Sequence, residues 1–300
     1  MQKKINPESV KALALDLDGT TLLPDNTMGE RTKQCLKRLA GRGIQMMICT
    51  GRAIEGSYRY YNAIETHGPM VFFNGAEVAD VPADIPTNIP KPNSGSKIKV
   101  IESRFLSLDV VDFGIDLARS MDIHFQIFVP PGCIPEKKES PWEALLIDKI
   151  RAESEMYKNH TGVTPVVTDM KAAIAAPEVK GCFKAAFITD PALHDEIRQK
   201  MLDRFGGRIY IARTYPTFLE IMDASVSKGE GLKTVMRHRG LKPEEVIAFG
   251  DEENDLPMFS VAGFSAAPAN AKESVRKAAD FVFGSNAEEG LAAFLQELFG

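Results

Sequence analysis

Residues 11–20 of the chain are KALALDLDGT, and this stretch decides the fold. Residues 11–17 are β-prone and mostly apolar, and they lead directly into the turn Asp18-Gly19-Thr20. A short apolar run that ends in such a turn is typical of a buried parallel strand. Because open α/β sheets bind ligands at the carboxyl ends of their strands, we expect Asp16 and Asp18 to lie at a binding edge.

The sequence around this stretch alternates between strand and helix patterns. Strands are expected at 44–49 and 70–73, with a helix at 30–40 and another that reaches Tyr61. After Lys228 the alternation resumes, with strands expected at 246–249, near 264 and at 281–283, and helices at 229–239, 256–261, 271–279 and 287–299. This order predicts an α/β fold with a doubly wound, parallel, Rossmann-like sheet.

A stretch rich in Pro and Gly, residues 81–96, interrupts the alternation. Strands are then expected at 123–129, 183–188, 208–212 and 218–221, and helices at 142–159 and 192–205. A length of 300 residues also favours two domains. We therefore expect a catalytic core of residues 1–83 plus 223–300 and an inserted α+β cap of residues 84–222, with every strand of the core sheet outside the cap.

Composition excludes some classes of partner. Lys and Arg total 36 against 41 Asp and Glu, a net charge of −5, which gives no general attraction to nucleic acid or to an anionic membrane. The four cysteines form no metal-binding cluster and are interpreted as free thiols. No signal peptide is apparent, and no apolar stretch approaches the roughly 18 residues of a membrane span. We expect a soluble, cytoplasmic protein that is a monomer or a weak homo-oligomer.

A second acidic motif should reach the same sheet edge. Residues 250–255 are GDEEND and follow the strand expected at 246–249, so Asp251 is expected near Asp16. Converging carboxylates call for a cation, and oxygen ligands without His or Cys nearby indicate Mg²⁺. The alternative interpretation is solvated aspartates in strand-ending turns and a polar helix start.

Two further motifs are suited to phosphate. Thr50-Gly51-Arg52 offers a hydroxyl, backbone N–H groups and a helix N-terminus, which together can bind phosphate. Lys228 stands at a predicted helix start, where a cation is unfavourable unless an anion compensates it. An ordinary turn and a solvated lysine are the alternatives.

On these motifs the chain resembles the haloacid dehalogenase-like (HAD) hydrolases, and among them the Cof-type subgroup, class IIB, with a C2-type cap. The matching segments are DLDGTTLL (16–23), TGR (50–52), FNGA (73–76), LEIMDASVSKGEGL (219–232), GDEENDLPMF (250–259), ANA (269–271) and AD (279–280). The insert 84–222 matches mainly by position and size. One segment departs from the family: residues 263–271, GFSAAPANA, place Pro268 where a flexible, Gly-rich rim is expected.

The resemblance implies a role for each matching residue. Asp16 would be the nucleophile that attacks phosphorus, Asp18 the general acid and base, and Lys228 a catalytic cation. Mg²⁺ would be held by the Asp16 carboxylate, the Asp18 backbone carbonyl and Asp251. The residues that would bind the substrate phosphate are Thr50, Gly51, Arg52, Asn74 and Asn254. Asp255 would support Lys228 or the metal waters.

The implied activity is hydrolysis of a small phosphorylated metabolite, with sugar phosphates the commonest substrates of the family. Two alternatives remain open. One is a phosphomutase or another phosphotransferase on the same scaffold. The other is a non-catalytic sensor of a phosphorylated ligand, although a binder has no need for a nucleophile together with a general acid.

Overall fold

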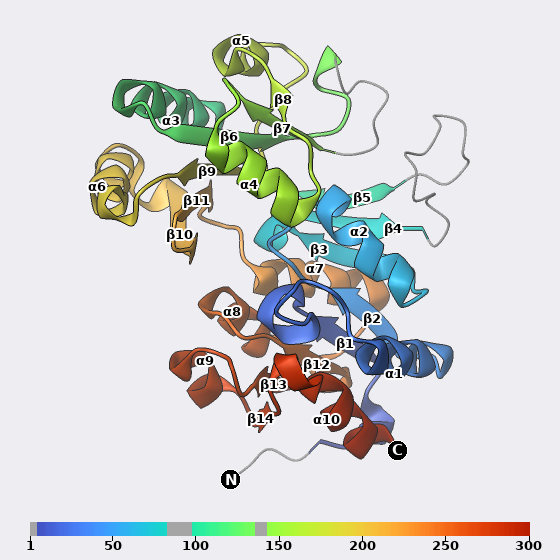
Figure 1. The fold of residues 1–300 in the computed structure, drawn as a ribbon. Coiled ribbons are helices and arrows are strands. Elements are labelled where there is room, and N and C mark those ends of the chain that lie inside the picture. Colours follow the sequence, from blue (N-terminus) through green and yellow to red (C-terminus); the bar gives the residue numbers. More distant parts are fainter. Residues whose placement is uncertain (1–4, 83–97, 136–142) are drawn as a thin grey trace.

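The structure is a computed structural model that describes residues 5–82, 98–135 and 143–300. Its lower part in Figure 1 is a parallel sheet of five strands in the order β14-β13-β12-β1-β2. The bounds are β1 Ala12–Leu15, β2 Gln45–Ile48, β12 Val246–Phe249, β13 Phe264–Pro268 and β14 Phe281–Phe283. Strand β1 is flanked by β12 on one side and β2 on the other, which explains why all four of its residues are apolar and buried.

Helices cover both faces of this sheet. Alternate residues of β1 enter different clusters: Leu13 and Leu15 pack with α1 and α10, and Ala12 and Ala14 pack with α7 and α8. The bounds are α1 Glu30–Gly41, α7 Lys228–Arg239, α8 Leu256–Phe259, α9 Glu273–Ala278 and α10 Gly290–Phe299. The doubly wound sheet predicted from the sequence is thus confirmed.

A second sheet continues from the first. Strands β3 (Gly68–Phe72), β4 (Glu77–Val81) and β5 (Lys99–Ser103) are antiparallel, and a parallel bridge between Cys49 and Val71 joins β3 to the end of β2. Helix α2 is Ile54–Ala63. Strand β5 falls inside residues 84–222, yet Glu102 of this strand accepts a hydrogen bond from Thr234 of α7 at 2.6 Å. The insert therefore contributes a strand to the side of the molecule that carries the parallel sheet.

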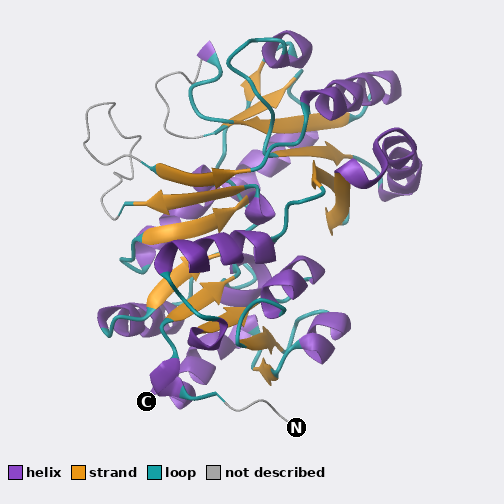
Figure 2. Cartoon of the chain, turned by 180° about the vertical axis from the view of Figure 1, so that it is seen from behind, coloured by secondary structure: helices purple, strands orange, loops and turns teal. Residues whose placement is uncertain are grey.

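The third sheet has six strands in the order β10-β11-β9-β6-β7-β8 and is antiparallel except for the pair β7–β8. Its strands are β6 His124–Val129, β7 Ala144–Ile147, β8 Val166–Val167, β9 Lys184–Ile188, β10 Ile209–Tyr215 and β11 Phe218–Asp223. The helices beside it are α3 Leu108–Met121, α4 Ala152–Thr161, α5 Met170–Ile174 and α6 His194–Phe205. We call this sheet, helices α3 to α6 and the described segments that connect them the cap, and the other described residues the core. Figures 1 and 2 show the cap at one end of the molecule, with β3–β5 between it and the parallel sheet.

The two faces of the cap sheet differ in what they meet. Residues such as Phe187 and Ile221 pack with α3, α5 and α6. The other face joins a cluster that includes core residues, in which Phe183 stacks on Phe73 with ring centroids 5.0 Å apart and Phe128 lies 5.1 Å from the same ring. Aromatic contacts of this kind bury large apolar areas, so the cap packs on the core through a hydrophobic interface.

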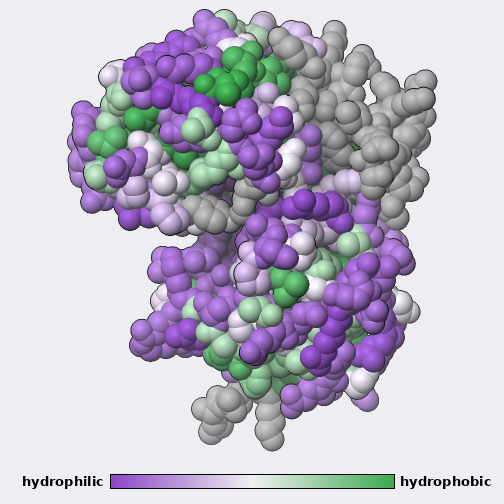
Figure 3. All heavy atoms as spheres, viewed as in Figure 1, coloured by the Kyte–Doolittle hydropathy of each residue, from purple (hydrophilic) through white to green (hydrophobic). Residues whose placement is uncertain are grey.

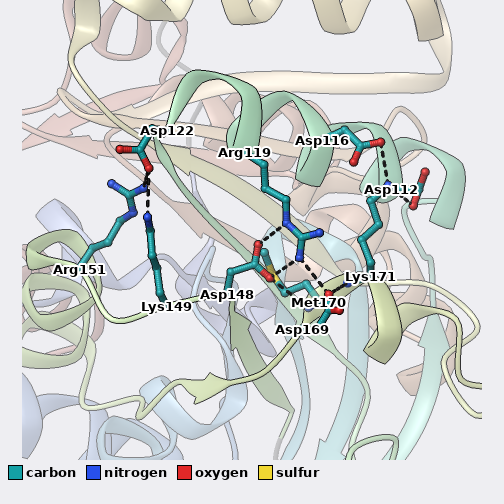
Figure 4. Close-up of polar contacts among 10 residues, drawn as sticks. All are labelled: Asp112, Asp116, Arg119, Asp122, Asp148, Lys149, Arg151, Asp169, Met170 and Lys171. Atoms are coloured by element: carbon teal, nitrogen blue, oxygen red, sulfur yellow. Dashed lines mark hydrogen bonds and ion pairs between the residues drawn. The ribbon is translucent and has the colours of Figure 1, made fainter.

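Ion pairs tie the outer elements of the cap together (Figure 4). Arg119 of α3 donates to both oxygens of Asp148, at 2.7 and 2.8 Å, and to Asp169 at 2.9 Å. Lys171 of α5 reaches back to Asp112 and Asp116 of α3. These contacts connect α3 with the segments that flank β7 and α5, and each of the two cations is shared between two carboxylates.

One predicted element of the cap is wrong. Residues 142–159 were expected to form a single helix, but Ala144–Ile147 is strand β7 and helix α4 begins only at Ala152. All four residues of β7 are buried in the sheet. A short apolar run has no periodicity that separates a buried strand from a helix, and tertiary packing decides it. Among the described residues, no helix has the length and apolar composition needed to cross a membrane.

Candidate active site

The acidic motifs meet at the carboxyl edge of the parallel sheet. Asp16 follows β1 and Asp251 follows β12, and these two strands are paired in the sheet. The turn after β1 approaches Asp251 so closely that a Cβ on Gly19 would lie 2.2 Å from Asp251 Oδ2, and the φ of Gly19 is +75°. Only glycine accepts both conditions, which explains why this residue stands between the two acidic segments.

Lys228 lies at the centre of the cluster. Its Nζ donates to Asp16 Oδ1 at 2.6 Å and to Asp255 Oδ1 at 2.7 Å, and all three side chains are buried. Burial opposes the charged form of the lysine, but the two carboxylates outweigh it, so the pKa of Lys228 lies above its ordinary value. The anion expected to compensate Lys228 at the start of α7 is thus a pair of aspartates.

The donor set fits a hard divalent cation. Carboxylate oxygens of Asp16, Asp251 and Asp255 lie within 4.8 Å of one another. Both oxygens of Asp255 are already used, since Oδ1 accepts from Lys228 and Oδ2 accepts from the backbone N–H groups of Asp251 and Glu252. Asp16 Oδ2 and Asp251 Oδ2, by contrast, accept no hydrogen bond from the described residues. These two oxygens are the ones suited to an ion, while Asp255 holds Lys228.

The electrostatics of the cluster support the same assignment. Burial, followed by the repulsion of Asp255, raises the pKa of Asp251 to about 7. Burial also raises the pKa of Asp16, with Lys228 opposing and Asp255 and Asp251 adding to the rise. Carboxyls that are this costly to ionise are stabilised as anions by a nearby cation.

The structure brings Arg52 to Asp18. Arg52 Nε donates to Asp18 Oδ2 at 2.7 Å, and a second guanidinium nitrogen contacts Oδ1. The guanidinium is buried over the ring of Tyr60, and Asn26 Oδ1 accepts from it at 3.2 Å. Arg52 was expected to bind phosphate, but its guanidinium fixes the orientation of Asp18 through a bidentate pair.

The predicted phosphate-binding residues lie together beside this pair. Thr50 is fully buried, and its hydroxyl accepts from the N–H of Arg52 at 3.1 Å. Asn74 lies in a left-handed turn (φ 57°) after β3, donates its N–H to the carbonyl of Thr50 at 2.9 Å, and its Oδ1 accepts from Asn254 at 3.0 Å. Gly51, Asn74 and Asn254 line a cavity, whereas Thr50 is not among its lining residues.

This cavity has a volume of about 570 Å³ and lies between the core and the cap. Asp16, Asp18, Lys228 and Asp251 line it from the core side. Figure 3 shows the surface hollowed between the cap and the core. The cap residues that line it were not predicted from the sequence; they include Tyr157, Lys184, Thr214, Phe218 and Glu220.

Pro268 belongs to a strand in this structure. It is the last residue of β13 and pairs with Phe283 of β14. Two residues later, Asn270 donates to the carbonyl of Gly19 at 2.8 Å, so the segment after β13 is tied to the turn after β1. Pro268, which stands where the family pattern expects a flexible, Gly-rich rim, is therefore part of a regular strand.

A parallel sheet with a buried carboxylate–lysine cluster at its carboxyl edge, closed by a cap, defines an α/β enzyme that acts on an anionic substrate. Comparison with known proteins makes this specific. The family model for haloacid dehalogenase-like hydrolases matches residues 13–295. The chain belongs to this family of hydrolases.

Relatives of this chain are similar over almost its full length. It is 30% identical over 287 residues to the 5-amino-6-(5-phospho-D-ribitylamino)uracil phosphatase YitU of Bacillus subtilis. The matched region covers 96% of this chain and 97% of that protein. It is 25% identical to the pyridoxal phosphate phosphatase YbhA of Escherichia coli over 96% of this chain and 98% of that protein. A HAD subclass IIB sugar phosphatase of known structure shares the fold, with a TM-score of 0.72 and 21% identity over 96% and 98% of the two chains.

Proposed function

We propose that this chain is a Mg²⁺-dependent phosphatase that hydrolyses a small phosphorylated metabolite, a sugar phosphate, through an aspartyl-phosphate on Asp16. The observation that carries the proposal is the contact of Lys228 with both Asp16 and Asp255, next to Asp251 at the edge of the cavity. Asp16 Oδ2 is the oxygen suited to the ion, so Oδ1, which Lys228 contacts, is the one left to attack phosphorus.

The proposed reaction has two displacements. Asp16 attacks phosphorus, and the bond between phosphorus and the ester oxygen breaks while Asp18 gives that oxygen a proton. Water then attacks the phosphoryl group, Asp18 takes a proton from the water, and the bond to Asp16 breaks to release phosphate. Arg52 keeps Asp18 oriented through both steps. Lys228 neutralises Asp16 and the transferring group.

Asp16, Asp251 and the backbone carbonyl of Asp18 would hold the Mg²⁺ ion. When bound, the ion would supply positive charge that reduces the repulsion between Asp16 and an anionic phosphate. Gly51, Asn74 and Asn254 are in place to contact the phosphate, since they line the cavity beside these aspartates. Thr50 would act with them through the turn that it stabilises.

The names of the relatives support the substrate class. YitU is named for a phosphate ester of a ribityl chain and YbhA for pyridoxal phosphate, both small phosphorylated metabolites. We propose the domain division of residues 1–83 plus 223–300 and residues 84–222 with one change. Because β5 pairs with β4, the first boundary fits better after Ser103.

Release of inorganic phosphate tests the proposal. The purified chain with Mg²⁺ is incubated with a panel of sugar phosphates and with 4-nitrophenyl phosphate, without any acceptor, alongside the Asp16→Asn variant. We expect free phosphate from the wild type and none from the variant. Transfer of phosphate only when an acceptor is added would instead support a phosphotransferase, and binding of the esters without any turnover would support a sensor.

A further inference from the structure

The cap supplies a second buried ion pair to the cavity. Lys184 Nζ donates to Glu220 Oε1 at 2.6 Å, and both residues line the cavity together with Asp16 and Asp18. Lys184 lies on β9 and Glu220 on β11, which are neighbouring strands of the cap sheet. Their side chains are only 5% and 8% exposed.

This pair stands where apolar residues would be expected. Along both strands, the residues on the same face as Lys184 and Glu220 are Ala186, Ile188, Phe218 and Met222, and the last three belong to the apolar cluster between cap and core. Removing two charges from water is costly, and well-packed apolar residues at such positions are often at least as stabilising as the ion pair. Stability of the cap therefore gives no sufficient reason for this pair, and its position in the cavity suggests a role in binding.

Lys184 also reaches the core. Its Nζ donates to the backbone carbonyl of Gly51 at 3.0 Å, and Gly51 precedes Arg52, the residue that holds Asp18. In the proposed reaction, Asp18 protonates the oxygen that leaves with the alcohol. An alcohol bound at that oxygen would extend from Asp18 towards Lys184 and Glu220, because the cap side of the cavity lies there.

The pair has one donor and one acceptor to offer. An ammonium group has three N–H donors, and Lys184 uses two of them for Gly51 and Glu220. Glu220 uses Oε1 for Lys184, and its Oε2 accepts no hydrogen bond from the described residues. A hydroxyl group both accepts and donates, so two neighbouring hydroxyls can bind such a pair, one accepting from Lys184 and the other donating to Glu220.

We propose that Lys184 and Glu220 form the subsite for the alcohol part of the substrate and select phosphate esters that carry two adjacent hydroxyl groups. The proposal rests on the proposed phosphatase function and assigns its specificity to two residues of the cap. Tyr157 and Phe218, which line the same cavity with rings 6.0 Å apart, form an apolar wall beside the pair that suits the carbon chain between the hydroxyls.

Matched pairs of esters test this. The wild type, Lys184→Met and Glu220→Gln are assayed with Mg²⁺ on ribose 5-phosphate and 2-deoxyribose 5-phosphate, on two further sugar phosphates with their deoxy analogues, and on 4-nitrophenyl phosphate. Hydrogen bonds to charged groups contribute about 1.5–3 kcal/mol, which corresponds to roughly 10- to 150-fold in kcat/KM. We expect the wild type to prefer the diol ester of its best pair by about this factor.

In both variants that preference should fall to less than about threefold, because kcat/KM should fall more for the diol ester than for its deoxy analogue and for 4-nitrophenyl phosphate. Glu220→Gln keeps the side-chain shape. If Lys184→Met does not fold, this second variant still decides the question. Lys180→Met, at an exposed position of the cap, is the matched control and should keep the wild-type ratio.

Three results would overturn the assignment. The first is a wild type that hydrolyses esters without preferring the diol ester. The second is a pair of variants that keep the wild-type preference. An equal loss for all esters in both variants would identify the pair as a structural link between cap and core. If the wild type releases no phosphate from any ester, including 4-nitrophenyl phosphate, the phosphatase proposal itself fails, and this inference fails with it.

Discussion

A pair of buried glutamates between core and cap should make the stability of the protein depend on pH. Glu77 of β4 and Glu143, which precedes β7, are both about 1% exposed. Glu143 Oε1 accepts from the N–H of Ile54 at the start of α2, at 3.1 Å. The two glutamates therefore lie at a buried point, one on β4 and the other next to β7 of the cap sheet.

The directions of the two pKa shifts assign the proton. Burial raises the pKa of Glu77 well above its ordinary value, and the neighbouring Glu143 raises it further. Burial also raises the pKa of Glu143, to about 7, although its hydrogen bonds oppose the rise. Glu77 is thus the carboxyl that stays protonated, and Glu143 is the one that titrates near neutrality.

The sign and the magnitude follow. A carboxyl with a raised pKa binds a proton in the folded chain over a range where the unfolded chain has lost it, so the free energy of unfolding falls as pH rises through that range. For Glu143 the range runs from its ordinary value of 4.5 to about 7. At about 1.4 kcal/mol for each unit, the loss from this group is roughly 3 kcal/mol.

The Glu77→Gln variant tests the pair. Glutamine at position 77 is neutral in both the folded and the unfolded chain, so the variant removes the proton that Glu77 takes up on folding, and the free energy of unfolding should depend less on pH. Urea unfolding is measured from pH 5 to pH 8.5 for the wild type, for this variant and for Glu178→Gln, which changes an exposed glutamate. Asp251, whose pKa is also raised, is present in all three proteins. Its contribution to the pH dependence therefore cancels when each variant is compared with the wild type. Parallel curves for the wild type and Glu77→Gln would refute the reasoning.

Three further outcomes are expected at the active site. Exhaustive treatment with EDTA should abolish phosphate release, and Mg²⁺ should restore it, because Asp16 and Asp251 require a cation beside a phosphate dianion; full activity after chelation would contradict this. Asp18→Asn should lower turnover of a sugar phosphate by about 10²–10⁴ and that of 4-nitrophenyl phosphate less, with Mg²⁺ affinity little changed; equal losses for the two esters would argue against the acid role. Arg52→Gln should lower kcat of sugar phosphates by about 10- to 100-fold through misplacement of Asp18, and the effect should disappear in the Asp18→Asn background.

The parts of the fold predicted from the sequence are those that local pattern decides. Strand β1 was identified because a fully apolar run ends at a turn, and this run fills both faces of a central strand. Strand β12 ends in the same way, so parallel pairing alone brings Asp16 and Asp251 to one edge. Sequence motifs at strand ends therefore located the aspartate cluster without any knowledge of side-chain contacts.

Contacts between distant segments were not accessible in this way. Arg52 was predicted to bind phosphate and it lines the cavity, but its partner Asp18 lies 34 positions earlier, and nothing in the sequence indicates the pairing. Glu77 and Glu143 each appear as ordinary polar residues beside an apolar run. Their burial against each other depends on how the cap packs on the core, which is a tertiary property.

The alternation of side chains along the cap strands shows which residues share a face, but not which face is turned towards the core. In β9 and β11 every second residue faces the core, so Lys184 shares a face with Ile188, and Glu220 shares one with Phe218. In a surface strand this pattern would indicate charges directed to solvent. Once the cap sheet is known to cover the edge that carries Asp16 and Asp251, the same pattern places both charges at the cavity. The aspartate cluster is thus predictable from consecutive residues, whereas the cap residues that line the cavity become predictable only when the orientation of the cap is known.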